Sequence, residues 1–130
     1  MKKQLLFLSL AMICASCSES LEDRAEKEAK DYTHKNCPTP YINYERTDSC
    51  VFYRNSKTYT FYKRFSDKAD NKEAIDANRQ KMRQLLVDNL RSDTKAKAYK
   101  DEGFAFRYVY RSDKTGDVLL DETVTAKDYR

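Results

Sequence analysis

The stretch that decides the fold is GFAFRYVYR, residues 103–111, near the C-terminal end of the chain. Successive side chains of a strand point to opposite faces, so its four aromatic residues share one face: Phe104, Phe106, Tyr108 and Tyr110. Arg107 and Arg111 then lie on the other face, which meets water. The alternation predicts a strand that buries one face against a core and exposes the other.

Both neighbouring regions predict hairpins. Residues 112–117 (SDKTGD) have the composition of a turn, and residues 118–125 are predicted to form the returning strand. Upstream, residues 47–53 (TDSCVFY) and 58–65 (TYTFYKRF) are rich in aromatic and β-branched residues, with a turn between them. The sequence therefore predicts four strands in two hairpins.

A helical segment precedes each hairpin. Asp70 with Glu73 has the arrangement of a capping box and predicts a long helix to about Arg91. The buried stripe of this helix is expected at Ile75, Met82, Leu85, Leu86 and Leu90. Residues 20–36 predict an N-terminal helix capped by Ser20, and its apolar stripe is so narrow that a solvated tether and a docked helix both stay open.

The element order is helix, hairpin, helix, hairpin. It predicts an α+β fold with two layers: a four-stranded, mainly antiparallel sheet, one long helix packed on it, and an N-terminal tether helix. Charged residues make up 35% of the 130 residues, and the length suits one hydrophobic core. We expect a single α+β domain over residues 37–130.

The N-terminus has the pattern of a secretory signal peptide. Lys2 and Lys3 precede an apolar stretch over residues 5–13, which is too short to span a bilayer. The sequence that follows, Ala15-Ser16-Cys17, resembles the lipobox of bacterial lipoproteins. In that family a type II signal peptidase cuts before the cysteine, and the cysteine is acylated.

The resemblance implies a signal peptide over residues 1–16, lipidation of Cys17, and a lipidated tether and helix over residues 17–36. Together with the strands and the long helix, the layout is similar to small lipoproteins in the envelopes of anaerobic gut bacteria. The resemblance implies export and anchoring to the cell envelope, with the outer membrane as the expected place. Loss of the leader brings the mature chain close to neutrality, so no nucleic-acid partner is expected.

Two cysteines, Cys37 and Cys50, are left inside the mature chain. An exported protein meets an oxidising compartment, which favours a disulfide between them, although two separate thiols stay open. His34 and Asp48 lie near these cysteines in the sequence, but the spacing has none of the paired ligands of a zinc site. We expect neither a metal nor another cofactor.

Ten tyrosines without any tryptophan are the chain's other unusual property. A tyrosine buries its ring and still presents a hydroxyl, which suits contact with a protein or a glycan. Phe61, Phe104, Phe106 and Tyr108 are assigned to the core. The candidate binding surface consists of Tyr62, Tyr99, Arg107 and Arg111, with Tyr129 as a further candidate.

No catalytic set is recognisable, because one histidine and two isolated glycines provide neither a triad nor a phosphate-binding loop. The sequence favours a non-enzymatic, lipid-anchored domain that binds a protein or an extracellular ligand. Two alternatives stay open. One is an inhibitor or immunity-type module, and the other is a small hydrolase that uses Glu102 with Asp121 or Glu122.

Overall fold

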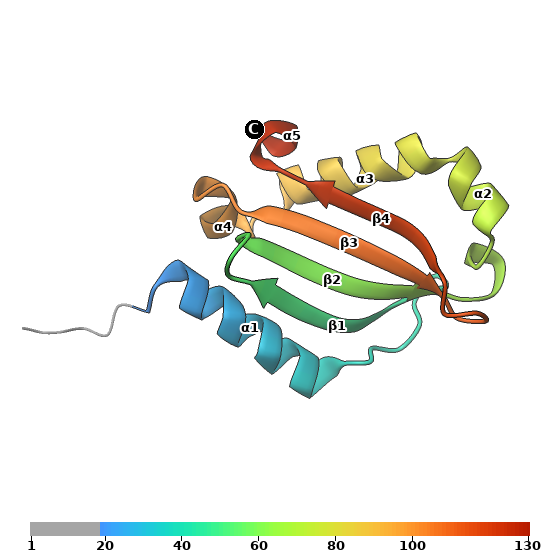
Figure 1. Cartoon of the computed structure of the whole chain (residues 1–130), viewed down its shortest axis with the longest axis horizontal. Coiled ribbons are helices and arrows are strands. Elements are labelled where there is room, and N and C mark those ends of the chain that lie inside the picture. The colour runs from blue at the N-terminus through green and yellow to red at the C-terminus, as the bar shows by residue number, and fades with distance from the viewer. Residues whose placement is uncertain (1–18) are drawn as a thin grey trace, which may run out of the picture.

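The computed structural model describes residues 19–130, so the predicted signal peptide and Cys17 lie outside the described residues. Four strands form one sheet (Figure 1): β1 (Glu45–Tyr53), β2 (Thr58–Phe65), β3 (Ala105–Ser112) and β4 (Val118–Val124). The helices are α1 (Leu21–Asn36), α2 (Lys72–Ala77), α3 (Arg79–Ser92), α4 (Lys97–Asp101) and α5 (Ala126–Tyr129), with a 3₁₀ turn η1 (Asp67–Ala69) after β2. The predicted α+β class, both hairpins and the N-terminal helix are confirmed.

The predicted mainly antiparallel sheet is confirmed in part: two of its three strand pairs are antiparallel, and the third makes the sheet mixed. Its strand order is β1-β2-β3-β4, and each hairpin is antiparallel. The central pair, β2 and β3, is parallel, with Tyr59 opposite Phe106 and Phe61 opposite Tyr108. The reason is the long helical connection between the hairpins, which returns the chain to the end of the sheet where β2 began.

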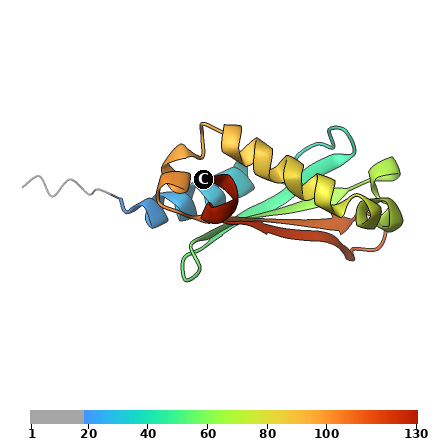
Figure 2. The ribbon, with the colours of Figure 1, turned by 90° about the horizontal axis from the view of Figure 1, so that it is seen from above.

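Helices cover only one face of the sheet, which we call the inner face. Seen from above, α1 and α3 lie on the same side of the strands (Figure 2). The main core lies between these helices and the sheet, and its fully buried members include Phe104 and Val124. The other face, which we call the outer face, carries Arg107 and Arg111, as the alternation predicts.

The N-terminal helix α1 is docked along β1 and is not a solvated tether. Ser20 caps it by accepting a hydrogen bond from the Asp23 backbone N–H at 3.1 Å, and Ala25 and Ala29 are fully buried against the sheet. Thr33 reaches the free edge of β1: its hydroxyl accepts from Cys50 N at 2.8 Å and donates to Cys50 O at 3.0 Å. The helix thereby satisfies backbone groups that an edge strand leaves exposed.

The predicted long helix is broken in two, and its cap is misplaced. Asn71, rather than Asp70, caps α2 by accepting from Ala74 N at 3.0 Å. At Asn78 the backbone leaves the helical conformation, and the side-chain amide donates to Ala74 O at 2.8 Å. Leu85, expected in the buried stripe, is 54% exposed, because the new direction of α3 turns it away from the core.

None of the helices in residues 19–130 is both long and apolar enough to cross a membrane.

We predict that Thr33→Val lowers the free energy of unfolding by about 1–2 kcal/mol, because the Cys50 N–H then lacks an acceptor while the side chain keeps its shape. Urea denaturation measures the change. Thr123→Val is the matched control, since Thr123 is exposed on β4. Equal stability of the two variants would contradict the role of Thr33.

Burial raises the pKa of four tyrosines on the inner side of the sheet, which are Tyr59, Tyr99, Tyr108 and Tyr110, and it raises that of the partly buried Tyr108 to about 12. Since the folded pKa exceeds the ordinary value of 10, the stability that these neutral hydroxyls contribute is complete below pH 10 and is lost as the pH rises further. We predict that ionisation linked to each of these tyrosines lowers the free energy of unfolding by about 1 kcal/mol by about pH 11. Denaturation across this range measures it. Tyr108→Phe should flatten the decline, and an unchanged decline would refute this assignment.

Candidate functional site

Three of the predicted surface residues lie together on the outer face. Tyr62 in β2 pairs with Val109, and Arg107 and Arg111 flank Val109 on the same face of β3. Arg107 binds Asp121 of β4 through two hydrogen bonds, at 2.8 and 2.6 Å, and this contact raises the arginine pKa. The Tyr62 hydroxyl lies 2.5 Å from that of Tyr53, and this hydrogen bond raises the pKa of Tyr62. The result is a polar surface of tyrosines and arginines, with a hollow of about 830 Å³ that Tyr53, Arg107 and Asp121 line.

Tyr99 does not belong to this surface. It lies in α4 on the inner side of the sheet and is buried. Its ring stacks on Phe104, with centroids 5.4 Å apart, and its hydroxyl donates to Glu28 of α1 at 2.5 Å. Burial and this hydrogen bond raise its pKa. Tyr129 is buried as well, where its hydroxyl donates to Phe104 O at 2.8 Å.

The inner face carries a groove that the sequence analysis did not predict. It has a volume of about 630 Å³ and lies over β2 and β3, between α1 on one side and the segment from Asp93 to Tyr99 on the other. Its floor includes Phe61 and Tyr108, whose rings stack with centroids 5.2 Å apart. Both rings are only partly buried, because neither helix extends over this part of the sheet.

The groove continues toward α3. A second hollow of about 310 Å³ shares Lys63 and Tyr108 with the first, and Leu85 and Leu86 of α3 line it. The exposed side chain of Leu85 therefore stands at the wall of an aromatic groove. Beside its closed core, the inner face thus presents two adjoining hollows, which we together call the channel.

Charged groups line the sides of the channel. In the first hollow Glu28 accepts a hydrogen bond from the Tyr99 hydroxyl, and Asp31 and Asp93 lie on opposite walls. Where the two hollows meet, Lys63 forms an ion pair with Glu45 and lies over the ring of Tyr110, 5.5 Å from its centroid. The channel thus combines an aromatic floor with a few charged groups along its walls.

The predicted disulfide is not supported, since Cys37 and Cys50 are both free thiols. Cys50 is buried in the main core, and burial raises its pKa to about 12. Burial also raises the pKa of Cys37, which follows the last turn of α1. Because the thiolate is the reactive form, neither residue has the environment of a redox-active cysteine.

The two carboxylates considered as partners of Glu102 in hydrolysis, Asp121 and Glu122, lie on opposite faces of the sheet. Asp121 binds Arg107 on the outer face, whereas Glu122 binds Arg83 of α3 at 2.9 Å on the inner side. Within residues 19–130, histidine, cysteine and acidic side chains form no group of three or more that could hold a metal ion.

Phe61 and Tyr108 are the residues whose role the sequence did not indicate. Their alternation correctly places them on the inner face, where the sequence analysis assigned them to the core. Whether a ring on that face is covered depends on where the helices pass. The one available signal was the narrow apolar stripe of α1, which predicts limited coverage.

Three solved structures share this fold. A Pseudomonas aeruginosa protein thought to be secreted has a TM-score of 0.70 and 20% identity, over 85% of this chain and 98% of that one. The pilotin EpsS of the Vibrio vulnificus type 2 secretion system has a TM-score of 0.63 and 20% identity, over 84% and 91%. The Vibrio cholerae pilotin AspS, also of a type II system, has a TM-score of 0.57 and 15% identity, over 82% and 90%.

At these identities the likeness concerns the fold. Among proteins with curated functions, none matches the sequence. One family model does match, over residues 20–120, which include α1 and all of β1, β2 and β3. The chain therefore belongs to the family described as Domain of unknown function (DUF8479).

Proposed function

We propose that the protein is a lipid-anchored, non-enzymatic protein of the cell envelope that binds an apolar segment of a partner protein in the inner-face channel. The observation that carries the proposal is the stacked pair of Phe61 and Tyr108, which the fold leaves partly uncovered between its helices. Large aromatic rings that line a groove are typical anchors for a protein partner.

The channel suits a partner segment that presents a row of apolar side chains better than it suits a small polar ligand. Five aromatic rings line the larger hollow besides Tyr32 of α1: Tyr59, Phe61, Tyr99, Phe106 and Tyr108. Its charged groups lie along the walls, where they can bind the backbone or charged residues of a segment that runs along the channel. Two neighbours of this fold are pilotins of type 2 secretion systems, and their membership of a secretion system is compatible with this proposal.

The anchor in the proposal is Cys17, which the lipobox pattern assigns to acylation. It stands four residues before the first residue of α1, and α1 is docked on the sheet. The lipid would therefore hold the domain close to the membrane surface at the end of the molecule where α1 begins. Several acyl chains give stable anchoring, whereas one chain binds only marginally.

Lipidation is tested by mass spectrometry of the mature N-terminus from cells. We predict a diacylglyceryl-modified Cys17 as the first residue, and a soluble or unprocessed protein for Cys17→Ser. Cleavage at another residue, or an uncut leader, would contradict the anchor.

The channel is tested by photo-crosslinking in intact cells, with p-benzoylphenylalanine placed at Phe61 or at Tyr62 of the full-length protein. These neighbours in β2 point to opposite faces, so they form a matched pair. We predict that the same partner is captured from position 61 and not from position 62.

Two further variants make the result specific. Tyr108→Ala removes one ring of the stacked pair and should reduce the crosslink from position 61 at least tenfold, the effect of an anchor residue worth more than about 1.4 kcal/mol. Tyr53→Ala removes an exposed ring from the outer face and should leave the crosslink from position 61 unchanged. Crosslinks from position 62 alone would move the binding surface to the outer face.

A further inference from the structure

Three arginines form a row across the outer face, at the end of the sheet remote from the start of α1. Arg46 of β1 pairs with Arg64 of β2, and Arg64 pairs with Arg111 of β3. Neighbouring strands lie about 4.8 Å apart, so three positive side chains stand side by side on one face. Like charges directly opposite each other destabilise a sheet unless an anion lies between them.

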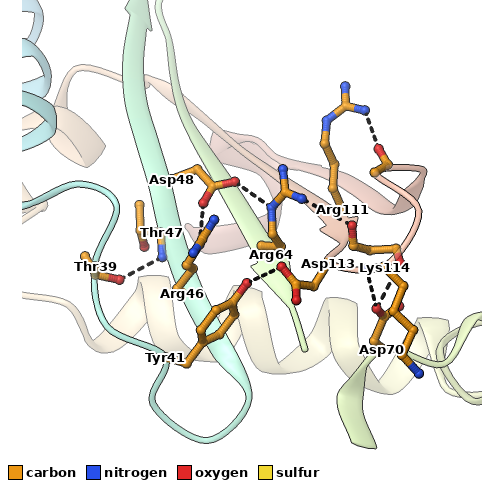
Figure 3. Close-up of polar contacts among 12 residues, drawn as sticks. Thr39, Tyr41, Arg46, Thr47, Asp48, Arg64, Asp70, Arg111, Asp113 and Lys114 are labelled. Carbon is orange, nitrogen blue, oxygen red and sulfur yellow. Dashed lines mark hydrogen bonds and ion pairs between the residues drawn. The ribbon is translucent and has the colours of Figure 1, made fainter. Parts of the chain in front are cut away.

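The carboxylate of Asp48 lies between Arg46 and Arg64, so the first gap of the row is filled. Asp48, at a bulge of β1, accepts from Arg46 Nε at 2.7 Å and from Arg64 Nε at 3.0 Å (Figure 3). The side chains of Asp48 and Arg64 are each 24% exposed, so this contact is partly shielded from water. The guanidinium of Arg46 also lies over the ring of Tyr41, 4.8 Å from its centroid. Arg46 and Arg64 are therefore held in place.

The second gap, between Arg64 and Arg111, has no such bridge. Among the side chains that the structure describes, no carboxylate forms an ion pair with Arg111, whose Nη1 donates to the backbone carbonyl of Gly116 at 2.9 Å. Arg64 Nη1 donates to Ser112 O at 3.4 Å. Most N–H groups of the two guanidinium groups remain available, since each carries five.

The loop that provides these two carbonyl acceptors is fixed to the rest of the fold. Asp70 accepts from Ser112 Oγ at 2.9 Å and from Lys114 N at 3.0 Å, and the Tyr41 hydroxyl donates to Asp113 at 2.7 Å (Figure 3). This is the role of Asp70 in place of the predicted helix cap. A fixed loop orients the two arginines before any ligand arrives, which lowers the entropic cost of binding.

We propose that the gap between Arg64 and Arg111 binds a phosphate-type oxyanion. The three arginines and Lys114 carry four positive charges against the three negative charges of Asp48, Asp70 and Asp113, so the cluster keeps a net positive charge. One guanidinium group satisfies both oxygens of a carboxylate through two parallel N–H donors. Two neighbouring guanidinium groups therefore match a tetrahedral anion, which has more acceptor oxygens, better than they match a carboxylate. The inference is independent of the inner-face channel.

The phosphate could belong to a soluble phosphoryl compound or to a lipid headgroup. The start of α1 lies beside the β1–β2 turn, where Asp23 binds Arg54 at 2.6 Å, and the arginine row lies at the opposite end of the strands. A lipid on Cys17 would therefore hold the row away from the anchoring point. This placement favours a soluble phosphoryl group.

NMR titration of the purified full chain with inorganic phosphate and with pyrophosphate tests the site through the arginine Nε–H resonances. We expect both anions to shift the signals of Arg64 and Arg111, and Arg111→Gln to weaken binding about tenfold, the loss of one charge-assisted contact. Arg111→Lys keeps the positive charge but loses the paired N–H donors of the guanidinium group. It should therefore restore only part of the anion binding that Arg111→Gln loses. Arg79→Gln removes the same charge from α3, where Arg79 pairs with Asp76, and should bind normally.

Flotation with phosphatidylcholine vesicles, with and without phosphatidylglycerol, distinguishes a lipid headgroup from a soluble phosphoryl compound as the source of the phosphate. Extra binding to the anionic vesicles that Arg111→Gln abolishes, with no response to free phosphate, assigns the site to lipid headgroups. The site is refuted if neither probe responds. It is also refuted if Arg111→Gln and Arg79→Gln weaken phosphate binding equally, because the effect is then one of net charge.

Discussion

The stacking of aromatic rings on the inner face of the sheet is the interaction on which the rest of the structure depends. Phe104 is completely buried, with its ring stacked on Phe52 at 5.1 Å and on Tyr99 at 5.4 Å. Each such ring buries about 150–250 Å² on folding. In a chain with few aliphatic residues these contacts bring together β1, the start of β3 and α4, which are far apart in the sequence.

The same rings determine how the helices pack. The small residues Ala25 and Ala29 let α1 approach β1 closely, but a helix with so narrow an apolar stripe covers little of the sheet. The helix α3 contacts β4. Phe61 and Tyr108 lie between the two helices, so the helices leave part of the aromatic sheet uncovered, and this part forms the channel. That channel is the feature that we propose as the binding site for a partner protein.

Local patterns were sufficient to predict the elements, whereas contacts between distant segments were not. The alternation of residues 104–111 and the cap at Ser20 each depend on a few neighbouring residues, and both are present in the structure. The role of Asp70 could not be inferred, because its carboxylate meets a loop more than forty residues away. The sequence predicts Tyr99 at the surface because the residues next to it in the chain are polar. In the structure α4 places its ring in apolar surroundings that those residues do not reveal.

The parallel pairing of β2 with β3 is the distant contact with the largest consequences. Arg64 and Arg111 are each next to the last residue of their strand, so they become neighbours only when the two strands run in the same direction. In an antiparallel pair Arg64 would lie near the first residues of β3, and the arginine row would not exist. The same register makes Phe61 and Tyr108 neighbours on the inner face. One crossover of the chain therefore creates both candidate sites, and the alternation of each strand keeps the aromatic site and the cationic site on opposite faces.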